Sequence, residues 1–244
     1  MAVSSRVSVI MLTRDRLDML KQSVDSVIGS YDRIELVVVD SSTNQEAMSR
    51  ALNPYHMETE EFCYIYRERG ESDPPCILPV CRNIGLDEAT GDYVTFHDSK
   101  NIQGRDKLSA AVQYLDTHPD VDVVFGNAKH PTGDLQNSKS AQEWLTRGLF
   151  KSQYEAKSNY IGINSAVWRR IFGVRLDPLS GTADDFDLAL TLSKLRLAYI
   201  DVDMYRSPGW HPGSVSARFN YADYIPGILE RHRMHYEGVC RAST

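Results

Sequence analysis

The sequence predicts an α/β protein with a Rossmann-like, mixed but mainly parallel sheet flanked by helices. Short β-branched and apolar runs, typical of strands buried on both faces, alternate with segments whose apolar residues recur at helical spacing. Strand, helix and strand in succession favour parallel βαβ units. Several of the runs end in acidic side chains, and parallel sheets bind their ligands outside the carboxyl ends of the strands.

The first half of the chain carries this alternation most clearly. Asp15 is suited to cap the first helix, and Pro79 fits the first turn of a later helix that Gly91 ends. Pro119 stops another helix, and the segment 41–44 (SSTN) predicts a turn. The expected strands are 6–12, 34–39, 62–66, 93–97 and 121–127, and the expected helices are 17–28, 79–90 and 108–115.

Beyond residue 128 the pattern is looser. Residues 221–236 predict a terminal helix that docks on the domain, although Pro226 and Gly227 argue against a single straight helix. The remaining expectations are a loop at 129–139, a short helix at 141–150, a strand and then a helix within 159–172, a helix at 186–192 and a strand at 197–202.

Composition narrows the class of protein. The 244 residues are 42% apolar and 25% charged, as in soluble globular proteins, and the net charge of −6 argues against nucleic acid as a main partner. Because no apolar run reaches the roughly 18 residues of a membrane helix and the N-terminus does not resemble a signal peptide, we expect a cytoplasmic protein without a transmembrane segment. A peripheral membrane contact through the tail is the weaker alternative.

The four cysteines have no zinc-ligand spacing. Reduced thiols are the expectation for a cytoplasmic protein. A disulfide between Cys76 and Cys81, which lie five residues apart around a proline-rich segment, is the alternative.

Polar side chains follow three of the predicted strands: Thr13, Arg14 and Asp15, then Asp40, then the segment 98–101 (DSKN). No G-x-G-x-x-G follows the first strand, and no G-x-x-x-x-G-K-[ST] occurs, so the usual phosphate cradles are absent. A nucleotide at this edge would need carboxylates for its ribose and base, and cations for its phosphates.

Four blocks of sequence carry a family resemblance: SVIMLTRDR, VVVDSST, RNIGLDEATGDYVTFHDSKN and DDFDLALTLSKL. Together they resemble the inverting glycosyltransferases of family 2, which have the GT-A fold; the match is good over 6–128 and looser to about 216. The resemblance implies a GT-A domain at 1–218, with a nucleotide-binding half (1–128) and an acceptor half (129–218), followed by a helical tail at 219–244. It implies transfer of a sugar, with inversion, from a nucleotide sugar, most simply a UDP-sugar, to a hydroxyl of a glycan, lipid or protein acceptor.

The resemblance also implies roles for single residues. Asp185 matches the catalytic base, which takes the proton of the attacking hydroxyl. Its neighbour Asp184 would lie beside the acceptor, and His211 would approach a metal ion together with Asp98. Apart from the resemblance, Trp168 is a candidate to pack under the acceptor cleft. The expected nucleotide-binding residues are Thr13, Arg14, Asp15, Asp40, Arg82, Asp98 and Lys100.

One departure from the family pattern bears on the metal. The D-x-D motif reads Asp98-Ser99-Lys100, and an ammonium cannot coordinate the Mn²⁺ or Mg²⁺ ion that the second aspartate binds in relatives. Lys100 would then replace the ion and reduce metal dependence. The alternatives are an ion held by Asp98 and His211, or a catalytically inactive module that binds a nucleotide or glycan.

Simpler roles remain open for the same residues. Asp98 and Asp185 are also suited to cap a turn or a helix, Lys100 could point into solvent, and Trp168 could be core. Asp187 is expected on a solvated helix face. The tail could also pair subunits into a homo-oligomer.

Overall fold

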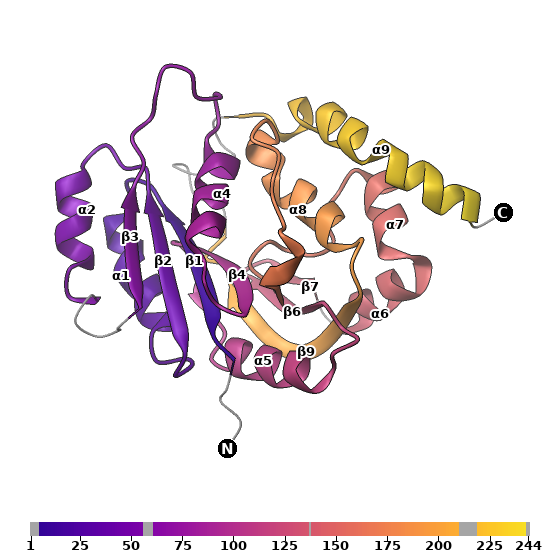
Figure 1. The fold of residues 1–244 in the computed structure, drawn as a ribbon, viewed down its shortest axis with the longest axis horizontal. Helices are drawn as coiled ribbons and strands as arrows, with labels where there is room; N and C mark the ends of the chain where they lie inside the picture. The colour runs from indigo at the N-terminus through magenta and orange to yellow at the C-terminus, as the bar shows by residue number, and fades with distance from the viewer. Residues whose placement is uncertain (1–4, 56–60, 137, 210–218, 243–244) are drawn as a thin grey trace.

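The computed structural model of the protein describes residues 5–55, 61–136, 138–209 and 219–242. Within these residues, nine strands form one mixed sheet with helices on both faces (Figure 1). The strands are β1 (Val7–Thr13), β2 (Ile34–Asp40), β3 (Phe62–Tyr66), β4 (Tyr93–Asp98), β5 (Ile102–Gln103), β6 (Val123–His130), β7 (Gly133–Gln136), β8 (Ala166–Arg169) and β9 (Leu197–Arg206). The α-helices are α1 (Leu17–Val27), α2 (Gln45–Leu52), α4 (Leu78–Glu88), α5 (Lys107–Thr117), α6 (Ser138–Arg147), α7 (Leu149–Ala156), α8 (Asp184–Leu192) and α9 (Ile225–Ala242).

The first half forms the parallel part of the sheet, in the order β3-β2-β1-β4. The strand β1 lies between the other two that carry acidic ends, with Thr13 opposite Asp40 and Leu12 opposite Asp98. Asp40 and Asp98 therefore reach the same edge of the sheet, as the sequence predicted. The expected α/β fold, with a mixed sheet flanked by helices, is confirmed.

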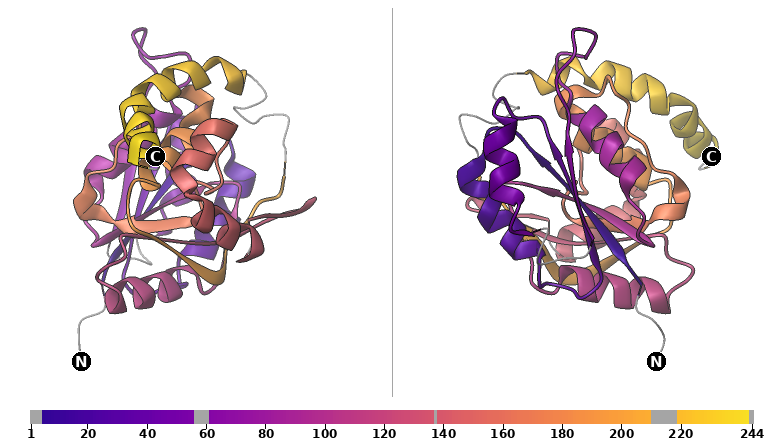
Figure 2. Two further views of the ribbon diagram at one scale, coloured as in Figure 1. Left: turned by 90° about the vertical axis from the view of Figure 1, so that its right-hand side faces the viewer. Right: turned by 60° about the vertical axis from the view of Figure 1, so that its left-hand side comes forward.

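Helices cover both faces of this parallel part. Apolar residues of α1, α2 and α5 pack on one face, whereas α4 packs on the other together with α8. Figure 2, in its right-hand panel, shows the strands between α1 and α2 on one side and α4 on the other. Because every residue of β1 and β2 is buried, these strands have continuous rather than alternating apolar sequences.

The second half completes the same sheet with a different pattern. The short strand β8 runs antiparallel between β4 and β6, and β9 lies parallel to β6. The two-residue strand β5, which directly follows the D-x-K segment, pairs with the end of β9. Residues 129–136, for which the sequence predicted a loop, instead form the β6–β7 hairpin.

The C-terminal helix docks on the domain, as expected, but two details of that prediction were wrong. Pro226 lies in the first turn of α9, where no backbone N–H is needed, so one α-helix continues to Ala242. Asp187 does not face solvent: its carboxylate is fully buried and accepts hydrogen bonds from Arg231 at 2.6 Å and His232 at 2.8 Å. These contacts, together with an apolar cluster around Phe150 and Ile228, fix α9 to α7 and α8.

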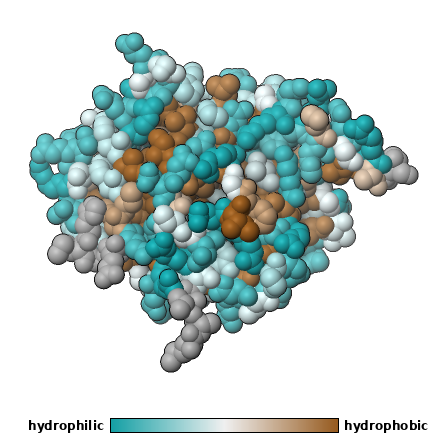
Figure 3. All heavy atoms as spheres, in the orientation of Figure 1, coloured by the Kyte–Doolittle hydropathy of each residue, from teal (hydrophilic) through white to brown (hydrophobic). Residues whose placement is uncertain are grey.

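The surface of the described residues is mixed. In the orientation of Figure 1, apolar side chains gather over α4 and the neighbouring strands, and hydrophilic ones dominate elsewhere (Figure 3). In the part of the chain that the structure describes, no helix has both the length and the apolarity to cross a bilayer.

Candidate active site

A cavity of about 210 Å³ opens at the carboxyl ends of β1 and β4, between the first turns of α4 and α8. It brings together seven of the residues predicted from the sequence: Thr13, Arg14, Arg82, Asp98, Lys100, Asp184 and Asp185. Cys76 and Cys81 line the same cavity as free thiols, so the alternative of a disulfide between them is wrong.

Arg82 lies at the centre of this group although it belongs to a helix. Its side chain is only 4% exposed, and Nε donates to Asp184 Oδ2 at 2.6 Å while Nη2 donates to Asp98 Oδ1 at 3.1 Å. Gly85, one turn later, allows α4 to approach β1, because a Cβ there would lie 2.3 Å from a methyl group of Ile10. Burial opposes the charge, but the two carboxylates raise the pKa of Arg82, which therefore stays a guanidinium.

Asp98, at the end of β4, is fixed from two directions. The side chain of Asn164 accepts from the Asp98 backbone N–H at 2.7 Å and donates Nδ2 to Oδ2 at 2.9 Å. Burial alone would raise its pKa, but Arg82, the amide of Asn164 and the ammonium of Lys100 lower the pKa of Asp98 to about 2. Asp98 is therefore an ion at neutral pH.

Lys107 lies fully buried beneath these residues. Its Nζ donates to the backbone carbonyl of Asn164 at 2.9 Å and reaches that of Phe96 at 3.4 Å. Burial lowers its pKa to about 7, against the weaker opposing effect of Asp98. An ammonium so deeply buried without a bonded carboxylate marks this part of the molecule as a site of unusual electrostatics.

Asp184 and Asp185 begin α8. Gly181, with φ of 57°, forms the turn that precedes them, and a Cβ there would lie 2.1 Å from the ring of Tyr224. The two carboxylates differ in environment: Asp184 is bound by Arg82, whereas Asp185 is half-buried and accepts from Asn159 at 3.3 Å and from the Phe186 backbone N–H at 2.7 Å. Burial, reinforced by the charge of Asp184, raises the pKa of Asp185 to about 7.

Polar atoms of the cavity lack protein partners. Among the described residues, Thr13 Oγ1, Arg82 Nη1 and Thr182 Oγ1 are buried and make no hydrogen bond, although all three residues line the cavity. The hydroxyl of Tyr221 is also buried and unpartnered, and its pKa is raised by burial and by the charges of Asp185 and Asp184. Because buried polar groups are rarely left unpaired, these atoms indicate a polar ligand.

Two predicted nucleotide-binding residues lie beside the cavity rather than in its lining. The carboxylate of Asp40 is fully buried and accepts from Tyr64 Oη at 2.7 Å and from the Ser42 N–H at 2.9 Å. That of Asp15 accepts from both the N–H and the hydroxyl of Thr43, each at 2.8 Å. Both carboxylates hold the loops around the cavity instead of facing into it.

Of the two remaining predicted residues, Trp168 is 1% exposed and packs against Phe96, with ring centroids 5.4 Å apart. It therefore belongs to the core, which is the simpler of the two roles that the sequence left open. His211 lies outside the described residues.

The described residues do not fit a divalent cation. Both carboxylate oxygens of Asp98 already accept hydrogen bonds, from Arg82 and Asn164, and Lys100 adds a positive charge close to this carboxylate. Within the described ranges, no three His, Cys, Asp or Glu residues are arranged to hold a metal ion. Hard divalent ions need several oxygen ligands, and this part of the cavity offers cations instead.

Sequence reasoning missed Asn164, Asn159, Thr182 and Lys107. Three of them act through tertiary contacts, and Thr182 lines the cavity; Asn164, for example, follows Asp98 by 66 residues. An asparagine in a turn is ordinary loop chemistry, so nothing local distinguished it. The lysine at the start of a predicted helix likewise gave no sign of burial.

Known proteins resemble this chain in sequence and in fold. The family model for glycosyl transferase family 2 matches residues 8–175. Glycosyltransferase GlyA of Streptococcus pneumoniae is 23% identical over 188 residues, covering 72% of this chain and 25% of that protein. An uncharacterised glycosyltransferase of Haemophilus influenzae is 27% identical over 110 residues, covering 45% of this chain and 42% of its own length. The chain thus spans less than half the length of these two relatives.

Solved structures share the fold. Staphylococcus aureus TarS (residues 1–349) in complex with UDP-GlcNAc superposes with a TM-score of 0.66 at 18% identity, covering 91% of this chain and 65% of TarS. The mannosyltransferase PcManGT of Pyrobaculum calidifontis, in complex with GDP-Man and Mn²⁺, superposes with a TM-score of 0.59 at 18% identity. The match covers 87% of this chain and 59% of PcManGT. With the family model matching more than half of its length, the chain belongs to glycosyl transferase family 2.

Proposed function

We propose that this protein transfers a sugar from a nucleotide sugar to an acceptor hydroxyl with inversion, using Asp185 as the base and no essential metal ion. The observation that carries the proposal is the cavity itself. It holds an unpartnered donor atom of a buried arginine, a free lysine and a carboxylate whose pKa is raised to about 7. Cations suit the diphosphate of a donor, and a weakly acidic carboxylate suits proton removal near neutral pH.

The proposed step is a single displacement. The acceptor hydroxyl attacks the anomeric carbon, Asp185 takes its proton, and the bond from that carbon to the diphosphate oxygen breaks, releasing a nucleoside diphosphate. Attack from the face opposite the leaving group inverts the anomeric carbon. A base placed in this way contributes about 10²–10⁴ in rate.

Arg82 and Lys100 would offset the charge of the leaving group. Arg82 is held by Asp184 and Asp98 through Nε and Nη2, which leaves Nη1 available to a phosphate oxygen. A unit charge pair at about 4 Å contributes roughly 4 kcal/mol at an effective dielectric near 20, so one ammonium can supply part of what an ion would. Thr13 and Arg14, at the end of β1, would contact the nucleotide from the other side of the cavity.

A uridine nucleotide is the proposed donor. TarS, whose fold superposes over 91% of this chain, binds UDP-GlcNAc and supports this choice, whereas PcManGT binds GDP-Man and represents the alternative base. We place the transfer on the cytoplasmic side of the cell, where nucleotide sugars would reach an open cavity.

The test is nucleotide binding followed by turnover. Thermal shift with UDP-, GDP- and TDP-sugars, each with EDTA and with Mn²⁺, should show stabilisation by one UDP-sugar under both conditions; a ligand at a hundredfold excess over Kd stabilises by about 2.7 kcal/mol. Asp185→Asn should keep this stabilisation and lose turnover. If binding requires Mn²⁺, the proposal that no metal ion is essential is refuted. If Asp185→Asn keeps full turnover, Asp185 is not the base. If the wild type binds the nucleotide sugar but shows no turnover, the protein is a catalytically inactive binding module instead.

A further inference from the structure

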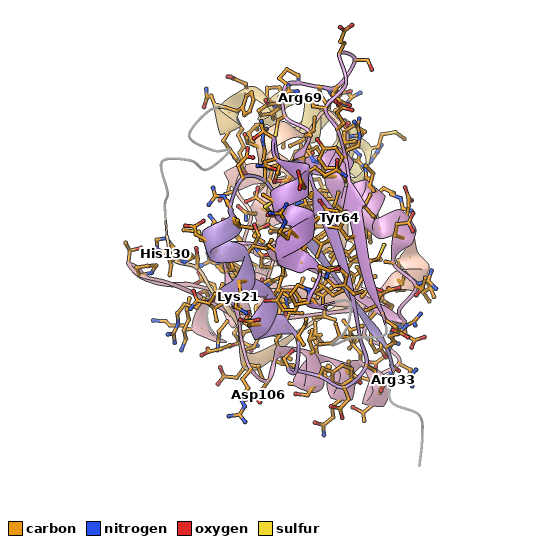
Figure 4. The ribbon with its side chains drawn as sticks, turned by 90° about the vertical axis from the view of Figure 1, so that its left-hand side faces the viewer. Lys21, Arg33, Tyr64, Arg69, Asp106 and His130 are labelled. Atoms are coloured by element: carbon orange, nitrogen blue, oxygen red, sulfur yellow. The ribbon has the colours of Figure 1, made fainter. Side chains whose placement is uncertain are left out.

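A second cavity, of about 340 Å³, lies where β5 and the end of β9 meet the start of α5. It follows the D-x-K segment closely, since β5 begins two residues after Lys100. Figure 4 views this side of the molecule, with Asp106 of the cavity and His130, next to Lys129, both labelled. The lining residues used below are Gln103, Arg105, Lys129, Asp203, Tyr205 and Arg206; we call them the basic cavity.

The lining of the basic cavity holds three cations and two carboxylates, Asp106 and Asp203, and so has an excess of positive charge on a protein whose net charge is −6. Lys129 and Arg206 are cross-strand partners in β6 and β9, and Arg105 joins them from the turn before α5. Like charges directly opposite one another on neighbouring strands are destabilising. Asp203 relieves part of this repulsion by pairing with Lys129 at 2.9 Å, but the two guanidinium groups remain.

These two arginines stand apart from most others in the protein. Among the arginines whose side chains the structure describes, only Arg33, Arg105 and Arg206 have a guanidinium group that makes no hydrogen bond or ion pair with another described residue. Two of the three line one cavity. A guanidinium group can donate two parallel N–H hydrogen bonds to the oxygens of a phosphate. Two guanidinium groups in one cavity therefore suit a phosphate group.

Tyr205 connects the basic cavity with the candidate active site. It lines the basic cavity, and it pairs in register with Gln103 of β5. Its hydroxyl comes within 3.1 Å of where a Cβ of Gly162 would lie, next to Ile163 of the active-site cavity. Burial and, after it, the charges of Asp98 and Asp185 raise the pKa of Tyr205. The ring therefore lines the basic cavity while its hydroxyl lies beside Gly162, the neighbour of a residue that lines the active-site cavity.

Gln103 adds a polar group of another kind. It is only 5% exposed, its Nε2 donates to Ser30 at 2.8 Å, and its Oε1 has no partner among the described residues. A side-chain carbonyl accepts hydrogen bonds and so suits a hydroxyl rather than an anion. The basic cavity therefore combines features for an oxyanion and for a polyol.

We propose that the basic cavity binds a phosphate group of the acceptor, with Arg105 and Arg206 as its principal contacts. The inference rests on the proposed function and names the class of acceptor: a phosphorylated polyol or sugar. Its phosphate would be held on one side of Tyr205 while its hydroxyl reaches Asp185 on the other.

Binding of simple probes tests the proposal. Protein saturated with UDP, which fills the donor cavity, is titrated calorimetrically with glycerol 3-phosphate, with glycerol and with inorganic phosphate at low salt. We expect glycerol 3-phosphate to bind at least tenfold more tightly than either of the others. The double variant Arg105→Gln/Arg206→Gln should bind glycerol 3-phosphate at least tenfold more weakly, because both guanidinium groups are lost.

Two controls make the result specific. Arg33→Gln removes the third unpartnered arginine, which does not line the basic cavity, and should bind glycerol 3-phosphate as the wild type does. All variants should melt close to the wild-type temperature, because none of the three side chains is buried or makes a hydrogen bond or ion pair with another described residue.

Unchanged binding in the double variant, or no binding by the wild type, overturns the proposal. Inorganic phosphate binding as tightly as glycerol 3-phosphate assigns the cavity to a free anion and overturns the acceptor role. Failure of UDP to bind refutes the proposed function instead, and the same titration on the free protein still decides the basic cavity.

Discussion

Arg82 of α4 and Asp184 of α8 form a buried ion pair at 2.6 Å across 102 residues of sequence. The pair links the helix that lies against β1 to the helix that carries the proposed base. It also leaves one donor atom of the guanidinium unused, in a cavity lined by unpartnered hydroxyls. The stability of the fold and the proposed nucleotide binding therefore both depend on the guanidinium group of Arg82, and both can be measured.

Replacing Arg82 by Met should destabilise the protein and abolish nucleotide binding. Breaking a buried pair by removing one partner costs about 3–5 kcal/mol, because Asp184 is left as an uncompensated charge. For a chain of this size we expect the melting temperature to fall by roughly 6–20 °C. Arg50→Met, which breaks an exposed pair with Glu46 on α2, is the control and should change stability by less than about 0.5 kcal/mol. Equal melting temperatures for the two variants would contradict the expectation.

The rate of sugar transfer should depend on the protonation of Asp185. Since burial and Asp184 raise the pKa of this carboxyl to about 7, the group is protonated and inactive as a base at pH 5, and the rate should rise about tenfold per pH unit below 7 before levelling off. The pH–rate profile of kcat checks this. Asp185→Asn should show a residual rate about 10²–10⁴ lower and without that inflection. A flat wild-type profile from pH 5 to 8 would rule out this base.

Changing Lys100 to Asp should convert the protein to metal dependence. The substitution restores the acidic pattern of the D-x-D motif and removes a cation that lowers the pKa of Asp98. With EDTA we expect nucleotide affinity to fall by about tenfold or more, and with Mn²⁺ to recover. Lys100→Ala should lose affinity in EDTA but recover less with Mn²⁺, because it lacks the second carboxylate. Wild-type binding abolished by EDTA would show that Lys100 does not have this role.

The buried ammonium of Lys107 should make stability depend on pH. Burial lowers its pKa from 10.5 to about 7, so between these values the unfolded chain binds more protons than the folded one. Stability should then rise as pH rises from 7 to 10, by an amount on the order of 4 kcal/mol at most. Chemical denaturation at pH 7 and at pH 9.5, compared between the wild type and Lys107→Met, isolates this contribution. If both proteins respond equally to pH, the ammonium is not the cause.

Detaching α9 from α8 should loosen the proposed base. Asp187→Asn weakens the contacts with Arg231 and His232 and should cost roughly 3 kcal/mol, because the charge partner of a buried cluster is removed. Hydrogen exchange of the α8 amides should accelerate along with that of α9. Arg233→Gln, which removes only surface pairs with Glu230 and Glu237, should leave both rates unchanged. Faster exchange confined to α9 would show that the two helices are not coupled.

The sequence predicted the parallel half of the fold well because its signals are local. Strands such as β1 and β2 are buried on both faces, so apolar runs reveal them directly. The helix α2 was missed because only Met48 and Leu52 of its residues are buried, which leaves almost no apolar period. Its one clear signal was Asn44, which caps the helix by accepting from the Ala47 N–H but reads as turn chemistry.

The sequence predicted most of the residues that form the candidate site, but it did not predict how their side chains are oriented. Chain order places Asp40 and Asp98 at one edge, but it does not reveal that Tyr64 and Ser42 turn the Asp40 carboxylate away from the cavity. Asp187 was expected in solvent because no residue near it in the sequence indicates that α9 packs against it. Both outcomes depend on contacts between distant segments.

The position of strand β8 limits how this protein can be divided or recombined by engineering. Although it belongs to the later half of the chain, it occupies the place between β4 and β6, both from the earlier half. A fragment ending near residue 128 would lack both β8 and β9 and would leave the edges that they cover on β4 and β6 unpaired, an arrangement prone to aggregate. Grafting a new acceptor specificity onto the molecule therefore requires exchanging loops within the intact sheet, not joining pieces end to end.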